Sequence, residues 1–196
     1  MMSQLKVGVL ALQGDFDCHL NHLRLLGASS HEIRLPHQLS GLDGLIIPGG
    51  ESTTMNMLID RFELRKPLAD FVGRKAVWGT CAGMIMLAKE VDDNRVNPFG
   101  VIDISVQRNA YGRQVYSFFA PVAANLNGNN ITLKASFIRA PRVTRIGPEI
   151  KVLAEYDHVP VLMSQKNCLA SSFHTELSEE PSLTKFFLDN FVSVYK

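Results

Sequence analysis

The sequence predicts an α/β protein whose central sheet is mainly parallel and carries antiparallel strands at one edge. In the first half of the chain, apolar runs of strand length alternate with helical patterns, which is typical of βαβ units. In the second half, short apolar segments are separated by Gly, Asn and Pro turns, which is typical of antiparallel strands. The 196 residues contain no repeat, linker or low-complexity segment, so we expect a single domain over residues 1–196.

The first half contains four predicted strands and three predicted helices. The first strand is a continuous apolar run that closes at Gly14, and Asp15 is placed to cap the following helix. In that helix Phe16, Leu20 and Leu23 recur at helical spacing, so they predict one buried face. The strands are predicted at residues 6–13, 32–36, 42–48 and 75–80, and the helices at residues 16–26, 55–59 and 81–89.

The second half consists mostly of short predicted strands, followed by one helix. Turn-forming residues separate the strands, so we expect them to extend one edge of the sheet as antiparallel additions. They are predicted at residues 101–107, 115–122, 131–137, 151–155, 161–165 and 168–173, and the closing helix at residues 182–194.

Composition and charge exclude several classes of function. The net charge of +1 argues against a nucleic-acid partner, which usually requires a basic surface. No apolar run approaches the roughly 18–20 residues of a membrane span, and the first residues do not resemble a signal peptide. Cys18, Cys81 and Cys168 are widely spaced and form no Cys-x-x-Cys pair, which favours free thiols in the cytoplasm. We expect neither a metal nor a cofactor.

Cys81 is the strongest candidate for a nucleophile because of the residues on either side of it. It lies in GTCAG (residues 79–83), between a predicted strand and a predicted helix, where Gly-x-Nuc-x-Gly forms a nucleophile elbow. The helix N-terminus favours a thiolate, and the N–H of Ala82 is free to donate to an oxyanion. A buried structural thiol is the alternative on these residues alone, and it is our preferred interpretation of Cys18 and Cys168.

His174 and Glu176 are the candidate general base and its orienting group. His174 closes a predicted strand, and in extended geometry Glu176 points to the same face, two residues further on. Glu176 can then accept a hydrogen bond from one ring nitrogen while the other nitrogen faces the thiol. His158 is a weaker candidate base in a strand-end turn. The remaining histidines are predicted to be surface or packing residues: His19, His22, His31 and His37.

The order of these motifs resembles the class I (triad) glutamine amidotransferases. GTCAG followed by FHTEL (residues 173–177) is similar to the Cys–His–Glu triad of that group. Four further segments closely resemble the glutaminase subunits of pyridoxal 5′-phosphate synthase: VLALQG (9–14), PGGESTT (48–54), QRNAYGRQ (107–114) and FIRAP (137–141). The resemblance runs from residue 6 to about 190. The family usually has proline where this chain has Thr175, which we expect to loosen Glu176 slightly; Tyr111, where Phe is common, is expected to be neutral.

The resemblance implies a three-layer, flavodoxin-like fold and hydrolysis of L-glutamine to glutamate and ammonia through a cysteine thioester. It implies Cys81 as the nucleophile, His174 as the acid and base, and Glu176 as the carboxylate that orients His174. The implied oxyanion hole consists of the N–H groups of Gly50 and Ala82. Glutamine is a zwitterion and needs a cation and an acceptor, and the residues implied to bind it are Gly49, Gly50, Glu51, Arg108, Ile138 and Arg139.

The resemblance also implies a partner, because ammonia released into water would be protonated and lost. That partner is a pyridoxal 5′-phosphate synthase subunit with a (β/α)8 barrel, which forms a hetero-oligomer with the glutaminase. Glutaminases of this family are nearly inactive alone. We expect Gln13 and the turn at residues 49–54 to sense the docked synthase.

Three alternatives stay open on the sequence. A different amidotransferase glutaminase, such as one serving imidazole glycerol phosphate synthesis, would share the triad but lack the segments at residues 107–114 and 137–141. A non-enzymatic subunit on an inherited glutaminase fold is disfavoured by the intact triad. A DJ-1-like thiol protein is disfavoured by the His-x-Glu pair.

Overall fold

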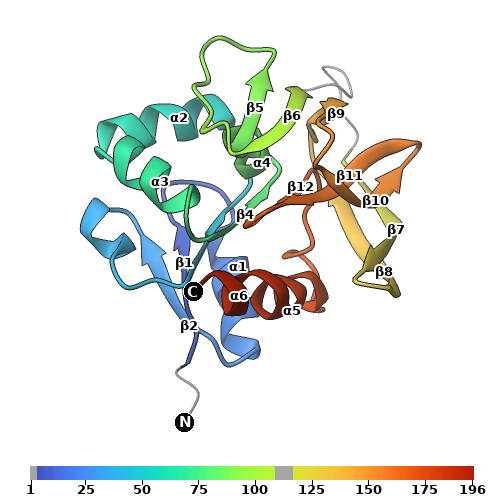
Figure 1. The fold of residues 1–196 in the computed structure, drawn as a ribbon, viewed down its shortest axis with the longest axis horizontal. Helices are drawn as coiled ribbons and strands as arrows, with labels where there is room; N and C mark the ends of the chain where they lie inside the picture. Colours follow the sequence, from blue (N-terminus) through green and yellow to red (C-terminus); the bar gives the residue numbers. More distant parts are fainter. Residues whose placement is uncertain (1–3, 109–116) are drawn as a thin grey trace.

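The computed structural model describes residues 4–108 and 117–196 (Figure 1). Its strands are β1 (Lys6–Leu10), β2 (Ser29–Ile33), β3 (Gly44–Ile47), β4 (Ala76–Thr80), β5 (Ala88–Val91), β6 (Ile102–Gln107), β7 (Phe118–Leu126), β8 (Asn129–Phe137), β9 (Arg142–Ile146), β10 (Lys151–Tyr156), β11 (Val159–Gln165) and β12 (Cys168–Ser171). Its helices are α1 (Phe16–Leu25), α2 (Ser52–Arg61), α3 (Arg65–Val72), α4 (Ala82–Leu87), α5 (Ser182–Phe187) and α6 (Ser193–Tyr195). A 3-10 turn (η1, Pro36–Leu39) follows β2, and a π-helical turn (η2, Leu188–Val192) joins α5 to α6.

A nine-stranded sheet in the order β2-β1-β3-β4-β12-β11-β10-β7-β8 forms the centre of the fold. Neighbours among the first five strands in this order run parallel. The pairs from β12 onward are antiparallel. The α/β fold class with a parallel sheet and antiparallel edge strands, predicted from the sequence, is confirmed.

Helices cover both faces of the parallel half of the sheet (Figure 1). Side chains alternate along a strand, so Val9 and Trp78 pack with α1 and α5 on one face. Leu10 and Val77 lie on the other face and pack with α2, α3 and α4. These two apolar layers attach helices to both faces of the sheet, which gives the three-layer architecture that the resemblance implies. They also hold the strand ends in place.

A second, three-stranded sheet in the order β5-β6-β9 departs from the sequence-based prediction. The strand predicted at residues 101–107 was expected at the edge of the main sheet, but it is β6, which pairs with β5 and β9 instead. The helix predicted at residues 81–89 ends at Leu87, because Ala88–Val91 pairs with β6. Neither α3 nor β9 was predicted: no capping side chain marks the start of α3, and four of the five residues of β9 are exposed.

The edge of the sheet at which the parallel strands end positions the candidate site. Thr80, the last residue of β4, is paired with Ser171, the last residue of β12, so both strands end at the same level. Ile47 of β3 is paired with Gly79 of β4, which brings the glycine turn after β3 to the same edge. Ligand sites of open α/β sheets lie at this edge, outside the carboxyl ends of the strands.

Candidate active site

Cys81 occupies a tight turn between β4 and α4. Its backbone has φ of 49° and ψ of −104°, a conformation that a residue with a side chain adopts only at an energetic cost. A Cβ atom on Gly83 would collide with the backbone oxygen of Ile47, and one on Gly79 would collide with the carbonyl group of Gly83. The strand–turn–helix geometry therefore agrees with the elbow predicted from the sequence, and it requires glycine on both sides of the cysteine.

The end of β12 brings His174 and Glu176 next to this turn. The backbone of His174 is fixed by two hydrogen bonds with Ser136 on β8, of 2.8 and 2.9 Å. The Nδ1–H of His174 donates to Oε1 of Glu176 over 2.6 Å, and the ring of His174 lines the same pocket as Cys81. The three predicted triad residues are thus brought together. The hydrogen bond between His174 and Glu176 is short, although Thr175 was expected to loosen Glu176 slightly.

Burial and neighbouring charges determine the protonation of His174 and Glu176. Burial alone would lower the pKa of His174, but the neighbouring side chains of Cys81 and Glu176 raise it to about 10. Burial alone would raise the pKa of Glu176, but the imidazoles of His19 and His174 hold it well below its usual value. The geometry therefore favours a glutamate anion beside an imidazolium, which is the arrangement that supports a thiolate.

His19, predicted to be a surface or packing residue, also contacts the carboxylate of Glu176. It lies on α1, is fully buried, and places Nε2 at 3.3 Å from Oε1 of Glu176. Its ring meets the ring of Trp78 edge-on, with the centroids 5.4 Å apart. The position of His19 on the same helical stripe as Phe16 and Leu23 is the signal that could have predicted its burial.

The other two thiols differ from Cys81 in their surroundings. Burial raises the pKa of Cys168 to about 12, so this thiol stays protonated and unreactive. Partial burial and then the carboxylates of Asp15, Glu176 and Asp17 raise the pKa of Cys18. Both thiols are therefore poor nucleophiles. Cys168 is buried, as predicted from the sequence, whereas Cys18 is only partly buried, so the prediction of a buried thiol is wrong for Cys18.

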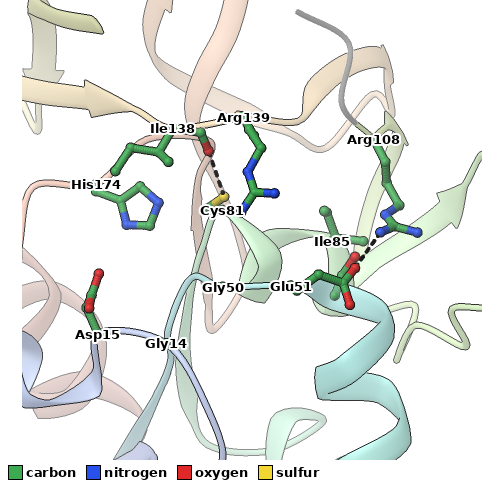
Figure 2. A pocket seen from close by; sticks show the side chains of 11 residues that line it. Gly14, Asp15, Gly50, Glu51, Cys81, Ile85, Arg108, Ile138, Arg139 and His174 are labelled. Carbon is green, nitrogen blue, oxygen red and sulfur yellow. Dashed lines mark hydrogen bonds and ion pairs between the residues drawn. The ribbon is translucent and has the colours of Figure 1, made fainter. Parts of the chain in front are cut away.

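A pocket of about 250 Å³ opens above the sulfur of Cys81 (Figure 2). Seven of the residues predicted for the site line it: Gly50, Glu51, Cys81, Arg108, Ile138, Arg139 and His174. Four further lining residues were not predicted to bind glutamine or to act in the reaction: Gly14, Asp15, Ser52 and Ile85. Asp15 was predicted to cap α1, and although it precedes that helix its side chain makes no capping hydrogen bond.

The remaining predicted residues lie behind the pocket wall. Gly49 packs against the ring of His174, and a Cβ atom on Gly49 would collide with that ring. Glu176 is buried behind His174, and Ala82 is the first residue of α4. Opposite them, the thiol of Cys81 is 3.9 Å from the carbonyl oxygen of Ile138.

The turn after β3 is held by Gln13, which lies just before α1. Gly50 has φ of 131°, a conformation that favours glycine, and a Cβ atom there would collide with the side-chain amide of Gln13. Oε1 of Gln13 accepts a hydrogen bond from the backbone N–H of Glu51 over 3.0 Å. The orientation of the peptide groups in this turn therefore depends on Gln13.

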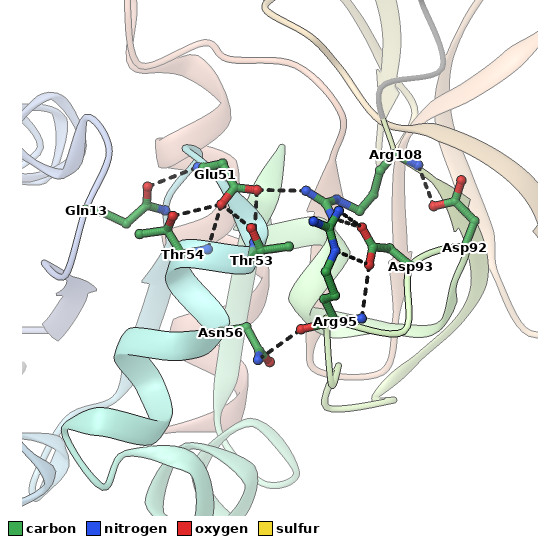
Figure 3. Close-up of polar contacts among 9 residues, drawn as sticks. All are labelled: Gln13, Glu51, Thr53, Thr54, Asn56, Asp92, Asp93, Arg95 and Arg108. Carbon is green, nitrogen blue, oxygen red and sulfur yellow. Dashed lines mark hydrogen bonds and ion pairs between the residues drawn. The ribbon is translucent and has the colours of Figure 1, made fainter.

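Glu51 and Arg108 form an ion pair with each other at one end of the pocket (Figure 3). Arg108 Nη2 is 2.7 Å from Glu51, and Nη1 is paired with Asp93, a residue that was not predicted to belong to the site. Burial raises the pKa of Glu51, but hydrogen bonds from Thr53 and Thr54 outweigh it and lower the pKa to about 2. Glu51 also caps α2 through these bonds, so it has a structural role besides the predicted one.

Within residues 4–108 and 117–196, no group of three or more His, Cys, Asp or Glu side chains is arranged to hold a metal ion. In the same residues, no helix has the length and apolar character needed to cross a membrane. Most of the segment at residues 107–114, including Tyr111, lies outside the described part of the chain.

Comparisons with known proteins place the chain in a family. The model of the SNO glutamine amidotransferase family matches residues 9–193. The chain is 48% identical to "Pyridoxal 5′-phosphate synthase subunit PdxT" of Deinococcus radiodurans and 46% identical to the protein of the same name from Fervidobacterium nodosum; each match covers 93% of this chain and 95% of the relative.

A solved structure described as the crystal structure of a glutamine amidotransferase superposes with a TM-score of 0.87. It is 43% identical, and the match covers 95% of this chain and 98% of that one. The family predicted from the sequence is therefore confirmed: the chain belongs to the SNO glutamine amidotransferase family.

Proposed function

We propose that the chain is a single glutaminase domain that hydrolyses L-glutamine and passes the ammonia to a pyridoxal 5′-phosphate synthase. The observation that carries this proposal is the hydrogen-bonded pair of His174 and Glu176 beside Cys81, at the base of one pocket. The names of the relatives from Deinococcus radiodurans and Fervidobacterium nodosum support the choice of synthase.

The reaction follows from the positions of the three triad residues. The thiolate of Cys81 attacks the side-chain amide carbon of glutamine, and the N–H groups of Gly50 and Ala82 stabilise the oxyanion that forms. His174 gives its proton to the nitrogen as the carbon–nitrogen bond breaks, so ammonia leaves and a glutamyl thioester remains. His174 then takes a proton from water, which attacks the thioester, and glutamate and the thiolate are released.

The pocket supplies groups for the two charged ends of glutamine. Arg108 and Arg139 offer cations for the α-carboxylate, and Glu51 offers an acceptor for the ammonium group. Gly49, Gly50 and Ile138 present backbone groups at the reacting end. Since Glu51 and Arg108 pair with each other, glutamine exchanges part of this ion pair for contacts of its own.

A docked synthase completes the site in this proposal. The partner is a (β/α)8-barrel subunit of a cytoplasmic hetero-oligomer, which receives ammonia without its release into water. Gln13 holds the backbone of the turn that carries Gly50, so contact at Gln13 can reorient the N–H of Gly50 toward the oxyanion. This explains why such a glutaminase would be nearly inactive alone.

The test is glutamate release, measured with and without a synthase subunit of the same organism. We expect release to rise sharply on addition of the synthase, and to be lost in Cys81→Ala and in His174→Asn. Cys168→Ala is the matched control, because it removes a buried thiol outside the pocket and should leave activity unchanged. Full activity of Cys81→Ala in the complex, or activation by a barrel synthase that makes no pyridoxal phosphate, would overturn the proposal.

A further inference from the structure

Two imidazole rings converge on the same oxygen of Glu176. Nδ1 of His174 is 2.6 Å from Oε1, and Nε2 of His19 is 3.3 Å from the same atom. All three side chains are buried, and among the described residues Oε2 of Glu176 has no hydrogen-bond partner. The triad carboxylate is therefore held at one oxygen, between α1 on one side and the end of β12 on the other.

The surroundings of His19 determine which of its nitrogens carries the proton. Nε2 faces Oε1 of Glu176 and lies 3.4 Å from the hydroxyl of Thr80, so a lone pair on Nε2 would be repelled by the carboxylate. Nδ1 is buried and has no partner in the part of the chain that the structure describes, so a proton there would leave an unpaired donor. The geometry therefore favours a proton on Nε2, which donates to Glu176.

We propose that His19 is a positioning residue for the glutaminase reaction: it donates from Nε2 to Glu176 and fixes the carboxylate that orients His174. This inference rests on the proposed function. A carboxylate with one buried partner can turn about its side-chain torsions, whereas one held from two elements cannot. The edge-on contact with Trp78 holds the His19 ring in turn.

The position of His19 links it to the nucleophile as well. Thr80, within reach of Nε2, directly precedes Cys81 in the elbow. His19 therefore touches both ends of the triad, the carboxylate and the turn that carries the thiol, without contacting glutamine itself. It affects the reaction through the alignment of His174, and the expected signature is a loss in kcat with little change in KM.

The experiment compares substitutions of His19 in the complex with the synthase subunit. His19→Leu removes the donor and keeps an apolar side chain of similar size, whereas His19→Gln keeps an N–H donor near the place of Nε2. His22→Leu is the matched control: His22 lies one turn further along α1, is also buried, and contacts Thr184 and the carbonyl of Ser178. Thermal unfolding of all three variants reports any general loss of stability.

We expect His19→Leu to lower kcat by about 10- to 100-fold, the range for loss of one hydrogen bond to a charged group, with KM within about twofold. His19→Gln should restore kcat to within roughly threefold of the wild type, and His22→Leu should keep the kcat of the wild type. The inference is overturned if His19→Leu keeps its kcat, if His19→Gln is as slow as His19→Leu, or if His22→Leu is equally slow.

A spectroscopic measurement separates this inference from the proposed function. Nitrogen-15 NMR of the histidine rings identifies the tautomer of His19, whose signals disappear in His19→Gln. A proton on Nε2 supports the contact with Glu176, and a ring with its proton on Nδ1 and none on Nε2 overturns it, whether or not the complex hydrolyses glutamine. A wild-type complex without glutaminase activity contradicts the proposed function, whereas an active complex with an unaffected His19→Leu variant contradicts only the role of His19.

Discussion

Replacement of Thr175 by valine should stabilise the protein, although this residue lies between two members of the proposed triad. Thr175 is buried, and among the described residues its hydroxyl has no hydrogen-bond partner. Valine has nearly the same shape but carries a methyl group in place of the hydroxyl. The substitution therefore removes an unpaired polar group and leaves the packing beside His174 and Glu176 in place.

The size of the effect follows from two contributions to the free energy of unfolding. A buried polar group without a partner costs about 1–3 kcal/mol, which the substitution regains. The methyl group adds burial worth roughly 0.8 kcal/mol at most. A central value of about 2 kcal/mol corresponds to an increase in Tm of about 4–8 °C for a chain of this length.

Thr184→Val provides the matched control, because the hydroxyl of Thr184 is equally buried but lies 3.3 Å from Nδ1 of His22. Loss of that hydrogen bond should destabilise the protein by about 1 kcal/mol. Urea denaturation followed by circular dichroism measures both variants. A Thr175→Val protein that is less stable than the wild type would refute the reasoning, and glutamate release in the complex should stay within about twofold of the wild type if the triad is undisturbed.

Three further predictions follow from the site. Gly83→Ala should lower the free energy of unfolding by about 2–4 kcal/mol, because its Cβ atom would collide with the backbone oxygen of Ile47; an unchanged urea midpoint would contradict this. The pKa of His174 is raised from 6.5 to about 10, so its stabilising contribution is complete below pH ~6.5 and is lost as the pH rises toward 10. Thermal unfolding should therefore show a steeper alkaline decrease in Tm for the wild type than for His174→Asn, and equal slopes would speak against the raised pKa. The pKa of Glu51 is lowered from 4.5 to about 2, so its contribution is complete above pH ~4.5 and is lost as the pH falls toward 2. Since Glu51 is partly exposed, this contribution is small. We expect the free energy of unfolding to fall by only about 1 kcal/mol less in Glu51→Gln than in the wild type when the pH is lowered from 5 to 2, measured by urea denaturation.

The parts of the site that could be predicted are those whose chemistry depends on residues close together in the sequence. Two glycines around Cys81 predict the elbow because the turn leaves no room for side chains. The spacing of His174 and Glu176 predicts their hydrogen bond, which the structure contains, because side chains two residues apart share a face wherever the chain is extended. The parallel half of the fold was predictable for a similar reason, since buried strands and amphipathic helices each carry their own periodicity.

The parts that could not be predicted depend on contacts between distant segments. The pairing of Asp93 with Arg108 joins the loop after β5 to the end of β6, and neither residue has a local pattern that predicts the other. The contact of His19 with Glu176 requires knowledge of which face of the sheet α1 covers. The separate sheet of β5, β6 and β9 was not predicted. Lys89 and Glu90 are residues that commonly continue a helix, but the helix ends at Leu87 because residues 88–91 pair with β6.

In the proposed mechanism, the central position of β12 also determines when the thiol of Cys81 becomes reactive during folding. Cys81 follows β4, whereas His174 follows β12, which joins the sheet between β4 and β11. During synthesis residue 81 leaves the ribosome well before residue 174, and pairing of segments so far apart in the chain is slow. Until β12 is in place, Cys81 has neither the imidazole nor the carboxylate beside it. The strand order therefore keeps an incompletely folded chain from carrying an activated cysteine.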